Sequence, residues 1–124
     1  METSMTTPRQ RLESLVDDPL EQFLAGQLSE RTRKAYKADV QAFFAFLGIE
    51  KADLDSLVPI NFQHVVAFRN DLAQRGYKRT TINRKLSSIK ALFKMIVAAG
   101  HLERNPADSA LVRGYKVEET MSGK

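Results

Sequence analysis

The sequence predicts an all-α fold, a single compact bundle of four to five helices joined by short connections. Apolar residues recur at the three-and-four spacing of a helix along most of the chain, and no convincing strand alternation is present. Glycines and short polar residues stand where these stripes end and begin, as helix caps do. A chain of 124 residues is long enough to bury one core.

Capping signals define the first two helices. The run Asp18-Pro19-Leu20-Glu21 contains an N-cap, a proline at the first helical position and a capping-box acid, and Gly26 ends this short helix. Ser29 caps a second helix that Gly48 stops. The residues predicted to face inward are Leu20, Phe23, Leu24, Tyr36, Val40, Phe43 and Leu47, with Phe44 and Phe46 widening the second stripe.

Two further helices follow. Asn61 caps a third helix that runs to about Arg75, with Gly76 as the residue after its C-cap. The fourth and longest helix runs from about Thr80 to Ala99 and closes at Gly100. The inner residues predicted for the two helices are Phe62, Val65, Phe68 or Arg69, Leu72, Ile82, Leu86, Ile89, Phe93 and Ile96.

The connections carry weaker signals. Residues 49–60 form a connection that Leu54 and Leu57 anchor. Asn105-Pro106 with Asp108 repeats the cap-and-proline signal and predicts a short last helix. The chain therefore divides into a disordered lead-in over 1–17, one domain over 18–112, and a linker or tail over 113–124, where the apolar pattern vanishes.

Charge is distributed unevenly around a modest net value of +4. No carboxylate lies between Leu72 and Leu102, whereas residues 1–30 carry six acids. The cations in the acid-free stretch are Arg75, Lys78, Arg79, Arg84, Lys85, Lys90 and Lys94. A phosphate backbone is a natural partner for such a surface, although charge alone fits a solvated helix face equally well.

A helical wheel indicates which residues lie on the outward face of each basic helix. Opposite the apolar stripe of the fourth helix we expect Thr80, Arg84, Ser87, Ser88 and Ala91. Short side chains let a helix approach the major groove, while arginine and threonine reach base edges and phosphates. The second helix likewise presents Arg31, Lys34, Ala35, Lys37, Ala38, Gln41 and Ala45, although alanine and lysine also simply favour helices.

No catalytic residue, metal site or cofactor is predicted. The chain has no cysteine, paired carboxylates or glycine-rich phosphate loop, and His64 is interpreted as a helix-face histidine. His101-Leu102-Glu103-Arg104 matches His-x-x-Arg by letters but lies in the loop after the fourth helix. No apolar run could span a membrane. A self-sufficient small enzyme therefore ranks last among the possible functions.

Three segments resemble, in order and spacing, the core-binding domain of the tyrosine recombinases, the phage-integrase family. Its opening helix is matched by Leu28-Ser29-x-x-Thr32-x-x-x-Tyr36-x-x-Asp39-Val40-x-x-Phe43-x-x-Phe46-Leu47. A later helix is matched by Thr81-Ile82-Asn83-Arg84-Lys85-Leu86-Ser87-Ser88-Ile89-Lys90-x-Leu92-Phe93, and the closing motif by Asn105-Pro106-Ala107. The resemblance covers about residues 20–110.

The resemblance implies a SAM-like bundle that forms one half of a clamp on a recombination half-site. It implies double-stranded DNA as the partner, and a neighbouring protomer as a contact of the first short helix. Carried over by position, the DNA-contact residues are Thr32, Ala35, Ala38, Thr80, Thr81 and Arg84. From charge and wheel position we add Arg31, Lys34, Lys78, Arg79 and Lys85 as phosphate contacts.

The resulting hypothesis is an isolated core-binding domain that binds DNA and does not cut it. Such a protein is expected in the cytoplasm of a prokaryote, at the nucleoid when bound to DNA. The parent would need a second domain with a nucleophilic tyrosine, for which Tyr36 and Tyr77 are not suited. The alternative is a helical protein–protein interaction module, which a large exposed apolar patch would favour.

Overall fold

The computed structural model describes residues 18–117, in which five helices and no strand are formed. They are α2 (Pro19–Ala25), α3 (Glu30–Leu47), α4 (Leu54–Leu57), α5 (Phe62–Gln74) and α6 (Arg79–Ala98). The prediction of an all-α bundle is confirmed. The expected lead-in over 1–17 and the last part of the expected tail, 118–124, lie outside the described residues.

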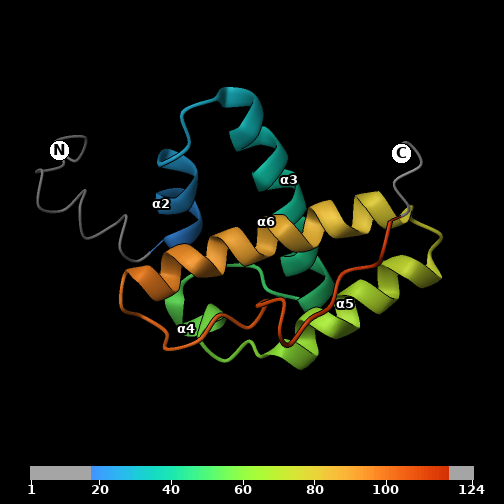
Figure 1. Cartoon of the computed structure of the whole chain (residues 1–124). Coiled ribbons are helices and arrows are strands. Elements are labelled where there is room, and N and C mark those ends of the chain that lie inside the picture. The colour runs from blue at the N-terminus through green and yellow to red at the C-terminus, as the bar shows by residue number, and fades with distance from the viewer. Residues whose placement is uncertain (1–17, 118–124) are drawn as a thin grey trace, which may run out of the picture.

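The long helix α6 organises the bundle, because it packs against α2, α3 and α5 (Figure 1). It crosses α3 at a steep angle and lies beside α5 in the view of Figure 1. After α6 the chain turns back and runs between α5 and α6 toward the start of α6, shown in red in Figure 1. None of the helices formed by residues 18–117 could span a membrane.

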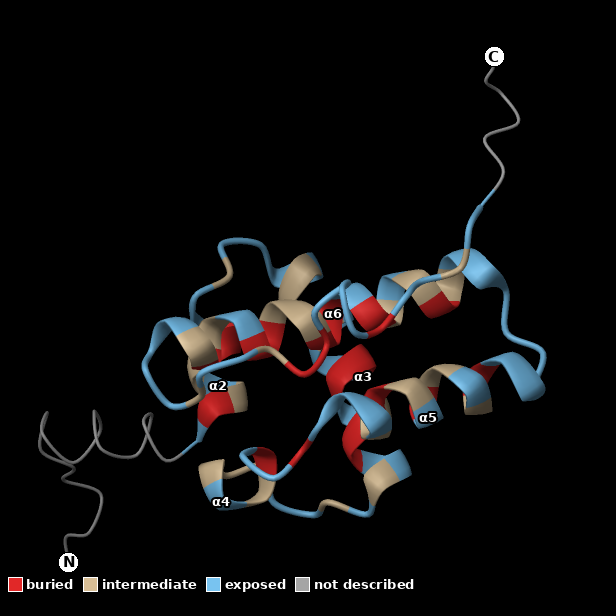
Figure 2. Cartoon of the chain, turned by 60° about the horizontal axis from the view of Figure 1, so that its bottom comes forward, coloured by how far each residue is buried: buried red, intermediate tan, exposed pale blue. Residues whose placement is uncertain are grey.

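One hydrophobic core fills the space between the helices (Figure 2). The ring centroids of Phe43 from α3 and Phe68 from α5 are 5.2 Å apart, and both side chains are fully buried. The predicted stripe of α6 is confirmed, since each of its five members is buried. Each buried phenylalanine removes a large apolar area from water and so stabilises the fold.

The predicted caps set the helix boundaries. Backbone N–H groups of the first turn donate to the side chains of Asp18, Ser29 and Asn61 at 3.1, 3.3 and 2.9 Å. Asn61 also donates its own N–H to His64 Nδ1 at 3.0 Å, which closes a capping box and gives His64 a structural role. Gly48 after α3 has a φ of 76°, which explains why a glycine ends that helix.

The connection over 49–60 contains a short helix that the sequence did not indicate. Asp53 caps α4 by accepting the Ser56 N–H at 2.9 Å, and this hydrogen bond lowers the pKa of the Asp53 carboxyl. The predicted anchoring is confirmed, because Leu57 is fully buried and Leu54 packs against the core. This segment therefore packs against the core through two leucines.

Three expectations about the fold are wrong. The segment after Asn105-Pro106 forms turns and not a helix, because Asn105 and Asp108 each accept a backbone N–H two residues ahead and so cap single turns. Phe62 and Phe46, both expected to face inward, are 40% and 39% exposed, although the Phe46 ring centroid still lies 5.5 Å from that of Phe68. The buried residues of the closing segment are Pro106, Ala107 and Val112, whose spacing does not form a helical stripe.

Candidate nucleic-acid interface

The outward face of the N-terminal half of α6 is polar, small and free of acids. Thr80, Arg84 and Ser87 are exposed on it, and Thr81 is half-buried beside them. Lys78 stands at the N-cap without a side-chain capping bond, and Lys78 and Arg79 are both exposed. The α6 N-terminus therefore combines the positive end of a helix dipole with cationic and hydroxyl side chains.

The outward face of α3 carries the second group of predicted contacts. Arg31, Lys34, Ala35 and Ala38 are exposed, and Thr32 is half-buried. The Lys34 side chain is 80% exposed, and its Nζ lies 4.0 Å from a Glu30 carboxylate that is also exposed. An exposed pair of this kind contributes about 0–1 kcal/mol at most, so it leaves the lysine available to another anion.

A polar cluster joins the two helices where they cross. Asp39 of α3 has a side chain only 2% exposed, yet it receives three donors from α6. Arg84 Nη1 lies 2.6 Å and Ser88 Oγ 2.7 Å from Asp39 Oδ2, while Lys85 Nζ lies 3.3 Å from Asp39 Oδ1. Burial of an unpaired carboxylate is costly, so these donors are what make the position tolerable.

The cluster changes how the predicted α6 residues are interpreted. Ser88 was expected on the outward face but is buried against Asp39, so that expectation is wrong. The buried arc of α6 is wider than one stripe, because α3 and α5 both cover this helix. Lys85 is only 13% exposed and directs its ammonium to Asp39, whereas Arg84 is 54% exposed at the surface.

The start of α6 is also held by the C-terminal strap, residues 113–117. The Asn83 side chain donates to Tyr115 O at 2.7 Å and accepts the Tyr115 N–H at 2.8 Å. The guanidinium groups of Arg69 and Arg79 lie 5.8 and 5.9 Å from the Tyr115 ring centroid, within cation–π range. The first residues of the predicted linker are thus fixed beside α5 and α6.

Sequence reasoning missed Asp39, Asn83 and Tyr115 as structural contacts. A signal for Asp39 did exist, since it lies three residues after Tyr36 and next to Val40, at the edge of the apolar stripe. An acid at that place on a helix needs a donor from another element. Nothing comparable marks Tyr115, because the strap has no periodicity.

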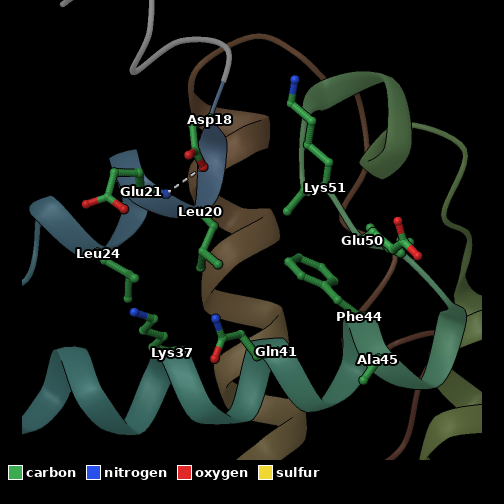
Figure 3. A pocket seen from close by; sticks show the side chains of 12 residues that line it. Asp18, Leu20, Glu21, Leu24, Lys37, Gln41, Phe44, Ala45, Glu50 and Lys51 are labelled. Atoms are coloured by element: carbon green, nitrogen blue, oxygen red, sulfur yellow. Dashed lines mark hydrogen bonds between the residues drawn. The ribbon is translucent and has the colours of Figure 1, made fainter.

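A groove between α2, α3 and residues 49–52 has a volume of about 510 Å³ (Figure 3). Leu20, Leu24 and Phe44 contribute apolar surface, and acids and lysines surround them on the rim. The mixed charge of this rim gives a phosphate backbone no consistent attraction. The exposed large apolar side chains elsewhere belong to several different elements.

No group of three or more His, Cys, Asp or Glu side chains within residues 18–117 could hold a metal ion. The His-x-x-Arg letters lie after the C-terminal end of α6, whereas Tyr115 is bonded to Asn83 near its start. From the rise of 1.5 Å per residue, about 25 Å of helix separates Asn83 from Gly100. These residues therefore do not meet.

The comparison with protein families agrees with the helical architecture. The family model for the phage integrase N-terminal SAM-like domain matches residues 20–100. The chain belongs to this family, and the earlier resemblance is confirmed. No solved structure matches the chain significantly.

Curated relatives place the domain among the tyrosine recombinases. The chain is 30% identical over 93 residues to the tyrosine recombinase XerC of Thermodesulfovibrio yellowstonii, covering 75% of this chain and 28% of that protein. It is 35% identical over 92 residues to the XerC of Mycobacterium bovis, covering 73% and 30%. The XerC of Chlorobaculum tepidum is 32% identical over 88 residues, covering 68% and 26%. The chain thus spans less than a third of these relatives.

Proposed function

We propose that this domain binds double-stranded DNA as one half of a clamp on a recombination half-site, and that its own residues perform no catalysis. The observation that carries the proposal is the acid-free outward face of α6, which crosses α3 beside a second small and basic face. Two such faces on crossed helices suit a grooved polyanion. Membership of a recombination family supports the same partner.

The candidate contacts divide by chemistry. Thr80, Thr81 and Arg84 carry the hydrogen-bonding groups suited to base edges, and Arg84 is suited to guanine O6 and N7. The α3 face carries short side chains, so the duplex can approach its backbone closely. These residues are Thr32, Ala35 and Ala38. The residues assigned to phosphate contacts are Arg31, Lys34, Lys78, Arg79 and Lys85. The ammonium group of Lys85 also contacts Asp39.

Because a half-clamp covers only part of a site, its binding is weak and salt-dependent. Non-specific affinity on the order of 10⁻⁴ to 10⁻⁶ M is expected at physiological salt. The catalytic domain of a recombinase and its neighbouring protomers on DNA supply the remaining binding energy. Such a protein acts in the prokaryotic cytoplasm, at the nucleoid.

The deciding experiment is an amide NMR titration of the chain with a generic duplex at low and then high salt. Salt-sensitive shifts clustered in residues 30–38 and 78–91 are the expected result. Complete lack of shifts would contradict the proposal.

A protein-docking module is the second candidate, and the groove of Figure 3 is the observation that favours it. Its apolar floor could receive a side chain from another protein, whereas its mixed rim charge does not suit DNA. In the titration above, a complete lack of shifts with the duplex would move the assignment to this candidate.

A further inference from the structure

Asp39 is the residue whose placement the DNA-contact assignment leaves unexplained. A carboxylate repels phosphate, yet Asp39 lies directly behind Arg84 and Lys85, two of the proposed contacts. We infer that Asp39 is a positioning residue that makes DNA recognition selective, by fixing the Arg84 guanidinium and by offsetting the charge of both cations. This inference rests on the proposed DNA binding.

The geometry fixes one end of the guanidinium and leaves the other free. Asp39 accepts from Nη1 of Arg84, and no other side-chain hydrogen bond of that guanidinium is formed with residues 18–117. Arginine has five N–H donors in a planar fork, so Nε and Nη2 remain for a ligand. Since the side chain is 54% exposed, these donors reach the surface at the α3–α6 crossing.

The rest of the cluster makes Asp39 immobile. Its carboxylate is buried, Ser88 Oγ donates to the same oxygen as Arg84, and Lys85 occupies the other oxygen. A fixed acceptor restricts the arginine to few rotamers before DNA arrives, which favours one base-edge geometry over others. An arginine without this acceptor would contact a phosphate of any duplex, whatever its sequence.

The charge of Asp39 acts in the same direction. It offsets part of the positive charge of Arg84 and Lys85, so attraction to any duplex is weaker than a count of cations suggests. Electrostatic attraction to phosphates carries no sequence information, whereas a positioned fork does. Asp39 thus lowers general affinity and raises the ratio of specific to general binding.

The test is Asp39→Asn in the full chain, which keeps the side-chain shape and removes the charge. With a generic duplex, binding at low salt should tighten by about threefold to tenfold, and the salt slope should steepen by about one unit. In selection from a random-sequence duplex pool, the sequence preference of the wild type should weaken at one position. A merely structural Asp39 predicts the opposite sign for the generic duplex.

Asp71→Asn is the matched control. Asp71 also pairs with an arginine, Arg75 Nε at 3.0 Å, but it does so on the surface of α5. This variant removes the same charge and should leave the selected motif unchanged. If Asp39→Asn behaves like Asp71→Asn in the selection, or binds every duplex more weakly with an unchanged slope, the inference is overturned.

If the amide spectrum shows that Asp39→Asn does not fold, Arg84→Lys tests the inference in its place. Lysine retains the charge and loses the fork, so the salt slope should stay and the preference should fall. An unchanged preference would overturn the inference while DNA binding stands. A wild-type chain that binds no duplex would instead overturn the proposed function, and this inference with it.

Discussion

The two basic faces of the domain differ in how firmly their cations are held. On α3, Arg31 and Lys34 are exposed. The Glu30 carboxylate, which lies 4.0 Å from Lys34 Nζ, is exposed as well. On α6, Arg84 and Lys85 contact a buried carboxylate and Arg79 lies over the Tyr115 ring. One face therefore offers mobile charge, and the other offers positioned donors.

This difference matters because the two kinds of cation do different work on a duplex. Mobile lysines gain affinity by releasing counterions and tolerate any sequence. Positioned arginines lose little entropy on binding and can distinguish base edges. If both faces contact DNA, α3 should contribute mainly salt-dependent affinity and α6 mainly preference.

The largest expected effect comes from removing the anchor of the α6 face. Asp39→Ala leaves the 13%-exposed Lys85 without its partner and opens the α3–α6 crossing. Loss of one partner of a buried ion pair costs about 3–5 kcal/mol, and we expect the lower end because Arg84 can turn to solvent. Urea unfolding, followed by circular dichroism, measures the change.

Glu30→Ala is the corresponding change on the α3 face. Its partner Lys34 is exposed, so the free energy of unfolding should change by less than about 0.5 kcal/mol. Equal shifts of the urea midpoint in the two variants would show that the cations of both faces are held alike, and the comparison would fail.

Arg84→Ala tests the second effect, on DNA. Binding to a sequence selected from a random pool should weaken by about 1–3 kcal/mol, with the preference lost at one position. The physical reason is that a bidentate donor to a base edge disappears. Fluorescence anisotropy on the selected duplex and on a scrambled one measures both values. Equal losses on the two duplexes would reduce Arg84 to a phosphate contact.

Gly114→Ala tests whether the strap holds Arg79. A Cβ at position 114 would lie 2.8 Å from Asn83 Oδ1, so Asn83 must move and weaken its two hydrogen bonds to Tyr115. We expect a loss of about 1–2 kcal/mol in unfolding free energy. Shifts of the Tyr115 ring and Arg79 Nε signals in NMR spectra should accompany it.

Gly26→Ala is the control for that substitution. Its Cβ would meet Phe23 O at 3.5 Å, an ordinary contact, and residue 26 has a right-handed φ of −79°. Little or no loss of stability is expected there. A strap that tolerates Gly114→Ala equally well would mean that Asn83 and Tyr115 do not restrain the start of α6.

The two faces also differ in how far the sequence predicted them. Helix caps, glycine stops and apolar stripes are local signals, so the bundle and most of its core were predictable from single segments. The Asp39–Ser88 contact joins residues 49 positions apart, and no period encodes such a pairing. That is why Ser88 was placed outside and Asp39 was overlooked.

The contacts of the strap and the turns after Asn105-Pro106 were not predicted, for another reason. Residues 113–117 have no apolar repeat, and their contacts depend on one asparagine and two arginines of α5 and α6. The cap-and-proline signal at Asn105-Pro106 is real, but it starts a turn because too few apolar residues follow. Local capping chemistry marks where a helix can begin and not whether packing will sustain it.

The smallest expected effect lies on the α3 face. Lys34→Ala should weaken binding to all duplexes alike and lower the salt slope by about one unit, because one phosphate contact is lost. Lys94→Ala is the control, since Lys94 is also exposed but lies on α6 outside the expected contact region. Binding isotherms at several salt concentrations give the slopes. A slope unchanged in Lys34→Ala, or one reduced equally in Lys94→Ala, would remove Lys34 from the interface and leave α6 as the helix that must supply both affinity and preference.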